Sequence, residues 1–152
     1  MSIVIVLHIL AMFIAFGFTT GTGILLTAIA SGGDVRSIRA AAKAIRPFQI
    51  AGGIILLVGV IFGFGAAQMA GFNLGATWLI VTYVAVALLL FSGMGIHGRW
   101  SAKLAAAAAA SPDDKPSAEL TAVIGDPLVR AVGPFSGLLW ILIISMMVIK
   151  PG

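Results

Sequence analysis

The long apolar stretches of this sequence, residues 3–30, 47–98 and 131–149, contain no aspartate, glutamate, lysine or arginine, and their two histidines are His8 and His97. An ionisable group in a membrane segment is by default a candidate functional residue. On a helix, His8 shares one face with Met12 and several small or hydroxyl residues, so we expect it to point into a helix bundle. His8 is then a haem or metal ligand, a proton carrier, or a histidine bonded to a backbone carbonyl or a nearby hydroxyl.

Haem b and copper are the two cofactors that these residues could bind. Imidazole is an axial ligand of haem iron, which makes His8 the candidate haem ligand. His97 cannot be the second ligand, because the predicted helices separate the histidines by on the order of 20 Å along the membrane normal. Thioethers and imidazole suit Cu(I). The candidate copper ligands, all at one expected depth, are His8, Met12, Met69, Met146 and Met147.

No other residues form a recognisable catalytic centre. His97 stands beside Arg99 and Trp100 at the expected membrane boundary, where a histidine needs no special role. The chain has no cysteine, and its acidic residues all fall between the apolar stretches, without a histidine partner. We therefore expect neither a catalytic triad nor a pair of catalytic carboxylates, and the sequence favours a protein without catalysis of its own. The acidic residues are Asp34, Asp113, Asp114, Glu119 and Asp126.

The composition places these residues in a membrane protein. Of 152 residues, 61% are hydrophobic and 9% are charged, which excludes an ordinary soluble domain. The apolar stretches lack alternation and are long enough for helices of about 20 residues that cross the bilayer, which argues against a β-barrel. We predict an all-α, four-helix transmembrane bundle forming one domain over residues 1–152. The predicted spans are residues 3–30, 47–70, 76–97 and 131–149.

The charged segments predict orientation and partners. Basic residues are concentrated between spans one and two and between spans three and four, so both segments should be cytoplasmic and both termini outside. This is the topology expected of a multi-pass protein of the bacterial inner membrane. The net charge of +4 is explained by topology and anionic headgroups rather than by nucleic acid. The expected partners are the lipid bilayer and either another membrane protein or a second copy of the chain.

Shorter patterns predict how the bundle is built. Residues 34–46 have a basic face beside an apolar stripe, which predicts a short amphipathic helix on the cytoplasmic membrane surface, in contact with anionic lipid or a partner, or simply anchoring the spans. Trp78 and Trp100, at opposite ends of span three, are expected in the aromatic belts, and Trp140 is expected to pack. Three glycine pairs predict close helix contacts. They are Gly17/Gly21, Gly59/Gly63 and Gly133/Gly137.

Three short motifs resemble a known family. LHILAMFIAFG near the start, GATWLIVTYV at the entry to span three and MMVIKPG at the end resemble the bacterial integral membrane family called domain of unknown function 2269. That resemblance implies four helices and no defined activity. More distantly, a histidine near the start of span one is similar to CopD-like and HemJ-like proteins, which implies a role for His8 in binding haem or copper. HemJ-like proteins pair this histidine with a later lysine, whereas residues 47–98 contain none.

These observations leave three functions open. The leading hypothesis is a small inner-membrane protein that acts as an accessory or assembly partner of a larger membrane system. The alternative is a haem- or copper-binding membrane protein centred on His8. A small transporter is the third, although the spans lack the midplane charge expected of one.

Overall fold

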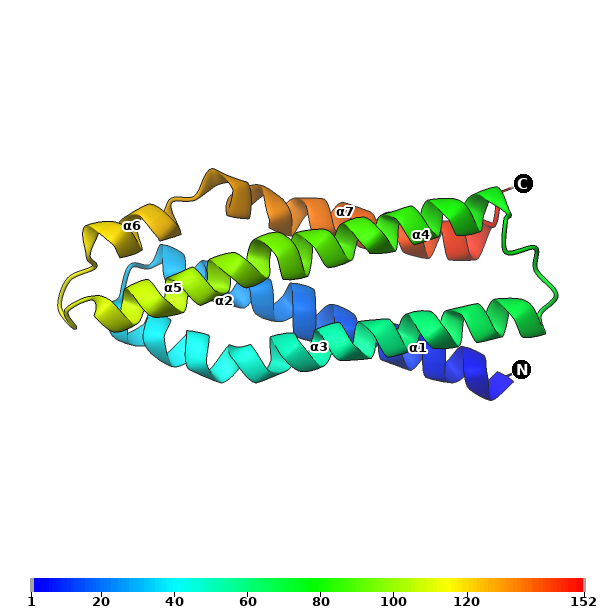
Figure 1. Cartoon of the computed structure of the whole chain (residues 1–152), viewed down its shortest axis with the longest axis horizontal. Helices are drawn as coiled ribbons and strands as arrows, with labels where there is room; N and C mark the ends of the chain where they lie inside the picture. Colours follow the sequence, from blue (N-terminus) through cyan, green and yellow to red (C-terminus); the bar gives the residue numbers. More distant parts are fainter. Residues whose placement is uncertain (1, 152) are drawn as a thin grey trace.

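The structure, a computed structural model that describes residues 2–151, is an elongated bundle of helices (Figure 1). Met1 and Gly152, the ends of the predicted domain, lie outside the described residues. The elements are α1 (Ser2–Phe16), η1 (Gly17–Gly21), α2 (Thr22–Ser31), α3 (Val35–Met69), α4 (Thr77–Leu90), η2 (Phe91–His97), α5 (Gly98–Ala110), α6 (Ala118–Ile124) and α7 (Pro127–Ile149). Here η marks a π-helix, and both π-helices continue their neighbours without a break.

The all-α, four-span prediction is confirmed. Four helical stretches are long and apolar enough to cross a membrane, namely Ile3–Ser31, Val35–Met69, Thr77–Ala110 and Ala118–Ile149. Both chain ends lie beside the turn at residues 70–76, which we call the hairpin end (Figure 1). The loops at residues 32–34 and 111–117 lie at the opposite, charged end. The chain is therefore a multi-pass membrane protein.

Local sequence explains where α7 begins and how far α5 extends. Asp126 precedes α7 and accepts a hydrogen bond from the Leu128 amide at 2.9 Å, and Pro127 occupies the first turn. Span three extends past Trp100, because α5 continues through the alanine run, a strong helix former, to Ala110.

The separate surface helix predicted at residues 34–46 is wrong. These residues are the first turns of α3, which runs unbroken through Pro47 to Met69. Their apolar stripe faces protein rather than lipid. Val35 and Ile38 are buried in the same cluster as Leu104 and Leu120 from α5 and α6. Packing on neighbouring helices therefore makes this segment a continuation of span two. An amphipathic pattern predicts an apolar face, but it does not show whether that face contacts protein or a membrane surface.

One of the three glycine pairs makes the predicted close contact. A Cβ built on Gly59 would lie 2.8 Å from Met12 Sδ, and one on Gly63 would lie 2.8 Å from His8 Cε1. Gly52 continues this surface, with Phe18 Cβ at 2.8 Å. Glycine thus lets α1 and η1 approach α3 closely. The prediction is wrong for Gly17/Gly21 and Gly133/Gly137, whose Cβ positions have nothing within 4 Å.

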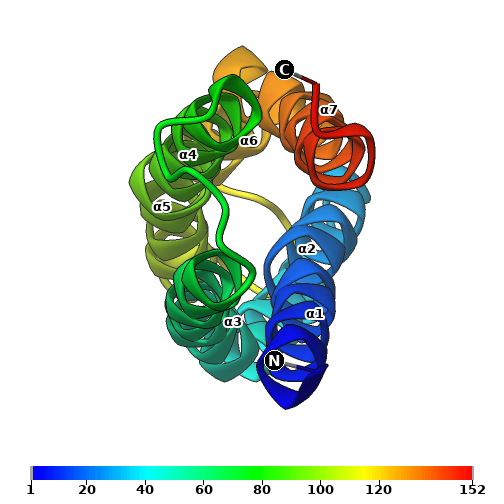
Figure 2. The same ribbon diagram turned by 90° about the vertical axis from the view of Figure 1, so that its right-hand side faces the viewer.

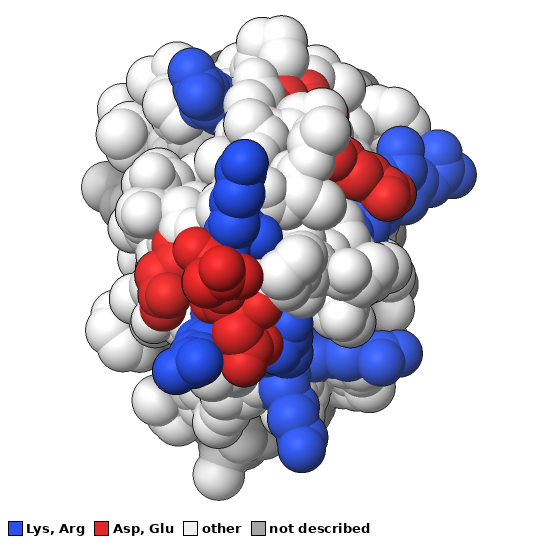
Figure 3. All heavy atoms as spheres, turned by 90° about the vertical axis from the view of Figure 1, so that its left-hand side faces the viewer, with Lys and Arg blue, Asp and Glu red and all other residues white. Residues whose placement is uncertain are grey.

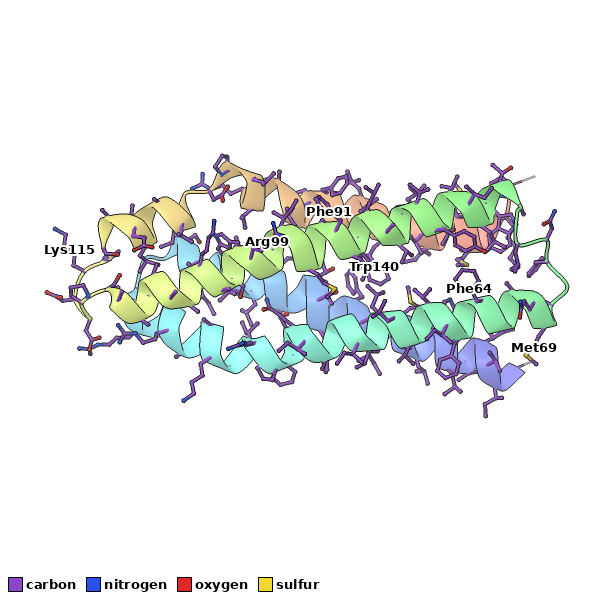
Figure 4. The ribbon with its side chains drawn as sticks, in the orientation of Figure 1. Phe64, Met69, Phe91, Arg99, Lys115 and Trp140 are labelled. Atoms are coloured by element: carbon purple, nitrogen blue, oxygen red, sulfur yellow. The ribbon has the colours of Figure 1, made fainter. Side chains whose placement is uncertain are left out.

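The aromatic-belt prediction is also wrong for both tryptophans. Trp78 is 5% exposed and Trp100 is 4% exposed, so both belong to the interior. The Trp100 indole N–H donates to the Val123 carbonyl at 2.8 Å, which ties α5 to the short helix α6. Trp140 packs as predicted, with its indole N–H 3.1 Å from the Thr20 hydroxyl oxygen. Figure 4 shows the Trp140 side chain lying between the helices.

Arg39 joins α3 to the end of α5 at the charged end. Its Nη2 donates to the carbonyl oxygens of Ala108 at 2.9 Å and Ser111 at 3.0 Å, and Nη1 lies 2.8 Å from the Asp113 carboxylate. Arg36 lies 3.3 Å from the same carboxylate. The hydrogen bond from Arg39 and the charge of Arg36 lower the pKa of Asp113 below its usual value. Figure 3 shows basic and acidic side chains interspersed on this end of the molecule.

Candidate functional site

A cavity of about 980 Å³ lies within the bundle, in the part nearer the charged end. All four membrane-crossing helical stretches contribute to its wall, with residues from η1 and α2, α3, η2 and α5, and α7. Figure 2 shows these helices arranged around the long axis, with α1 beside α3 and α4 beside α7, and α5 packs on α3. The size is that of a small-molecule site, and concave sites between the helices of a bundle are common places for ligands.

A short chain of polar groups forms one part of the wall. Ser101 donates to Oε1 of Gln49 at 3.3 Å, and Nε2 of Gln49 lies 3.5 Å from Nε2 of His97. With Oε1 accepting from Ser101, the amide NH₂ of Gln49 faces His97, whose Nε2 is then the acceptor. The indole of Trp100 supports the imidazole, with ring centroids 5.1 Å apart. Two helices thus orient an imidazole at a cavity wall.

The opposite helix leaves room for the His97 ring. A Cβ on Gly23 of α2 would lie 3.1 Å from Nε2 of His97, which is closer than ordinary carbon contacts. Gly23 is itself buried and lines the cavity. The absence of a side chain at Gly23 therefore leaves space for the imidazole. The residues next to Gly23 in the sequence do not indicate this contact, because His97 is 74 residues away.

Both π-helices contribute residues to the cavity. Thr19 and Thr20 come from η1, and Gly93, Met94 and His97 come from η2. A π-helix inserts an extra residue into a helical turn, shifts the face that side chains present, and occurs frequently at functional sites. The density of glycine at residues 17–23 and 93–98 is the only sequence signal that points to these segments, and it does not distinguish a π-helix from a packing face.

The charge of the cavity wall is positive. Arg46 of α3 and Arg130 of α7 belong to the lining, and in the described part of the chain no aspartate or glutamate does. The rest of the wall is largely apolar, with hydroxyls from both threonines of η1 and from Ser101 and Ser136. The arrangement can hold an apolar chain and hydrogen-bond or pair with a polar or anionic group.

His8, the residue favoured from sequence, lies elsewhere. Its Nδ1 is 2.7 Å from the Gly59 carbonyl oxygen, and its ring fills the space above Gly63 between α1 and α3. This contact matches the interpretation of His8 as a histidine bonded to a backbone carbonyl. A backbone bond at Nδ1 is also how metal-ligating histidines are often held, so the haem and copper hypotheses stay predictions.

The candidate copper ligands fall in different surroundings. Met12 lies with His8 against the glycines of α3. Met146 and Met147 of α7 pack on the cluster that contains Trp78. Met69 ends α3, is 54% exposed, and appears near the hairpin end in Figure 4. Among residues 2–151 there is no cluster of three or more histidine, aspartate and glutamate side chains that could hold a metal ion.

No family model, curated protein or solved structure matches this chain. The resemblance to domain of unknown function 2269, and the more distant one to CopD-like and HemJ-like proteins, therefore stay predictions. The cavity and its residues are the basis for any statement about function.

Proposed function

We propose that this protein binds an amphiphilic small molecule from the bilayer in the cavity around His97, and does so as an accessory component of a larger membrane system. The cavity carries this proposal. Its apolar wall accommodates a hydrocarbon chain, and the chain of Ser101, Gln49 and His97 offers hydrogen bonds to a polar head. A partner in the same membrane, or a second copy of the chain, would receive the bound molecule.

The proposal needs no catalytic step, which agrees with the sequence-based preference for a protein without its own catalysis. It also leaves His8 free for the alternative hypothesis of haem or copper binding. No contact of the described residues favours that alternative or a transporter over binding in the cavity. An absorption spectrum and metal analysis of the same purified protein would show whether haem or copper accompanies it.

Photocrosslinking in phosphatidylcholine nanodiscs tests the binding. The probe is a long-chain alcohol with a diazirine in its tail, and mass spectrometry identifies the labelled residues. We expect saturable labelling of the cavity wall that excess unlabelled alcohol removes. Labelling that never saturates and is confined to lipid-facing side chains such as Phe13, which is 76% exposed, would contradict the proposal.

A pair of matched variants sharpens this experiment. Gly93 lines the cavity, and Gly21 is exposed and outside its lining. Both lie in π-helices and have nothing within 4 Å of a built Cβ. Gly93→Leu should reduce cavity labelling several-fold because the new side chain occupies the binding volume, whereas Gly21→Leu should leave labelling unchanged. Equal labelling in both variants would argue against a ligand in the cavity.

We further propose that the charged end faces the cytoplasm of a bacterium and that both termini face outward. The concentration of basic residues in and beside the two charged-end loops supports this orientation. Asn73 and Lys115 are exposed at opposite ends of the bundle, so single cysteines there report on the two sides. A membrane-impermeant thiol reagent added to intact cells should label the cysteine at Asn73 and spare the one at Lys115. The reverse pattern would invert the topology.

A further inference from the structure

A second hollow lies on the outside of the bundle, where α3 passes α5. It has a volume of about 510 Å³. Its lining on α3 runs from basic to apolar residues over about two to three helical turns, and α5 closes the other side with a small side chain. The lining includes Arg39, Lys43, Arg46, Pro47, Ile50 and Ala105. We call this hollow the α3–α5 groove.

The basic residues of the groove differ in what they already bind. Arg39 is engaged with the end of α5 and with Asp113. Across residues 2–151, both ion pairs use the carboxylate of Asp113, with Arg36 and Arg39 as partners. Lys43 and Arg46 are exposed and have no acidic partner in this part of the chain. They are available to an anion.

The groove is also at the depth of lipid headgroups. Arg46 is the last charged residue before the uncharged stretch of residues 47–98, so it marks where α3 enters the membrane. Ile50, one turn further along the groove, is 56% exposed. A phosphate beside Lys43 and Arg46 would thus have its acyl chain beside Pro47 and Ile50, which is the order of groups in a phospholipid.

The groove and the internal cavity share part of their walls. Four residues line both hollows, and Arg46 is the charged one among them. The shared residues are Ala42, Arg46, Ile50 and Ala105. Ala105 is small, so α5 contributes little more than a methyl group to the wall that separates the two hollows. A lipid seated in the groove is therefore next to the volume that the proposed ligand occupies.

We propose that the molecule bound by this protein is an anionic phospholipid, whose phosphate is held by Lys43 and Arg46 in the α3–α5 groove and whose chain enters the cavity between α3 and α5. The inference rests on the proposed function, and it specifies the class of ligand and the route. A basic side chain near an anionic headgroup strengthens binding about fivefold, so loss of both should weaken it about thirtyfold.

The test compares two lipid probes in phosphatidylcholine nanodiscs. One is phosphatidylglycerol with a diazirine tail, and the other is the diazirine alcohol described above. We expect phosphatidylglycerol to label the groove and the cavity of the parent protein. Lys43→Gln combined with Arg46→Gln should weaken phosphatidylglycerol labelling about thirtyfold. Lys43→Gln alone, at a residue outside the cavity lining, should weaken it about fivefold and leave labelling by the uncharged alcohol unchanged.

Arg99→Gln combined with Lys103→Gln is the matched control, because both residues are exposed on α5, lie outside both linings and carry the same total charge. This control should retain phosphatidylglycerol labelling. An equal loss in the two double variants would mean a general surface-charge effect and would overturn the inference. A thermal melt of each variant confirms that it is folded.

The remaining outcomes separate the inference from the function on which it rests. If the alcohol labels the cavity but phosphatidylglycerol has no advantage over phosphatidylcholine bearing the same diazirine tail, the anionic-lipid inference fails and the binding function stands. If inorganic phosphate displaces the phosphatidylglycerol probe while chloride at equal ionic strength does not, the groove binds a free anion and the lipid assignment is wrong. If neither probe labels the cavity, the proposed function itself fails.

Discussion

Replacing Gly59 and Gly63 together with leucine is expected to lower the free energy of unfolding by about 3 kcal/mol, the upper part of the range for overpacked contacts. Cβ atoms at these positions would meet Met12 Sδ and the His8 ring at 2.8 Å, and the rest of each leucine would extend further into α1. The helices must then separate, which also breaks the hydrogen bond between His8 and the Gly59 carbonyl oxygen at 2.7 Å.

The matched control is Gly17→Leu combined with Gly21→Leu. It makes the same chemical change in η1, the continuation of α1, where a Cβ meets nothing within 4 Å. Since leucine favours helix formation over glycine by nearly 1 kcal/mol per residue, this control should be neutral or stabilising. Unfolding in mixed detergent micelles, followed by circular dichroism, measures both variants. Equal destabilisation would mean that the penalty comes from general glycine replacement and not from the α1–α3 contact.

Replacing Trp100 with alanine is expected to cost about 3–5 kcal/mol, as for other buried aromatic side chains. The indole is 4% exposed, packs in the cluster that includes Leu104 and Leu120, and donates to the Val123 carbonyl oxygen. Its loss leaves a cavity where α5, α3 and α6 meet. Trp100→Phe keeps most of the packing and loses the hydrogen bond, so it should cost roughly 1 kcal/mol from that bond.

Thermal melting combined with hydrogen exchange checks this prediction. Amide exchange over residues 118–124 should accelerate in Trp100→Ala, because α6 loses its tie to α5, while exchange in α4 should change much less. An aromatic-belt residue would behave differently. If Trp100→Ala melts like the parent protein and α6 exchanges at the parent rate, the prediction is wrong. Burial of the indole would then contribute nothing to stability, as expected of a tryptophan that contacts lipid.

The apolar stretches of the sequence are enough to predict the number and the type of the spans. Within the described residues, every apolar stretch is helical because a lipid-exposed backbone must satisfy its hydrogen bonds internally, and composition alone shows which stretches these are. Local chemistry also set several boundaries. Asp34 caps α3 through the Ser37 amide at 2.9 Å, and Asp126 caps α7 in the same manner.

Several patterns in the sequence are equivalent, and the packing of the helices selects which of them make contacts. Gly17/Gly21 and Gly59/Gly63 have the same spacing, but only the second pair faces a neighbouring helix. The stripe of Val35 and Ile38 is as suitable for lipid as for protein, and packing on Leu104 placed it in the bundle. Periodicity shows that a face exists, but it does not identify what covers that face.

The candidate site depended on the tertiary structure most of all. The sequence places His97 at the membrane boundary, because its neighbours Arg99 and Trp100 are typical of the membrane–water interface. Its position in the cavity wall comes from Gln49 and Gly23, which lie 48 and 74 residues away along the chain. Three separate elements therefore supply these groups, with His97 in η2, Gln49 in α3 and Gly23 in α2. A cavity is the volume that separate helices leave between them, so it exists only once those helices are assembled.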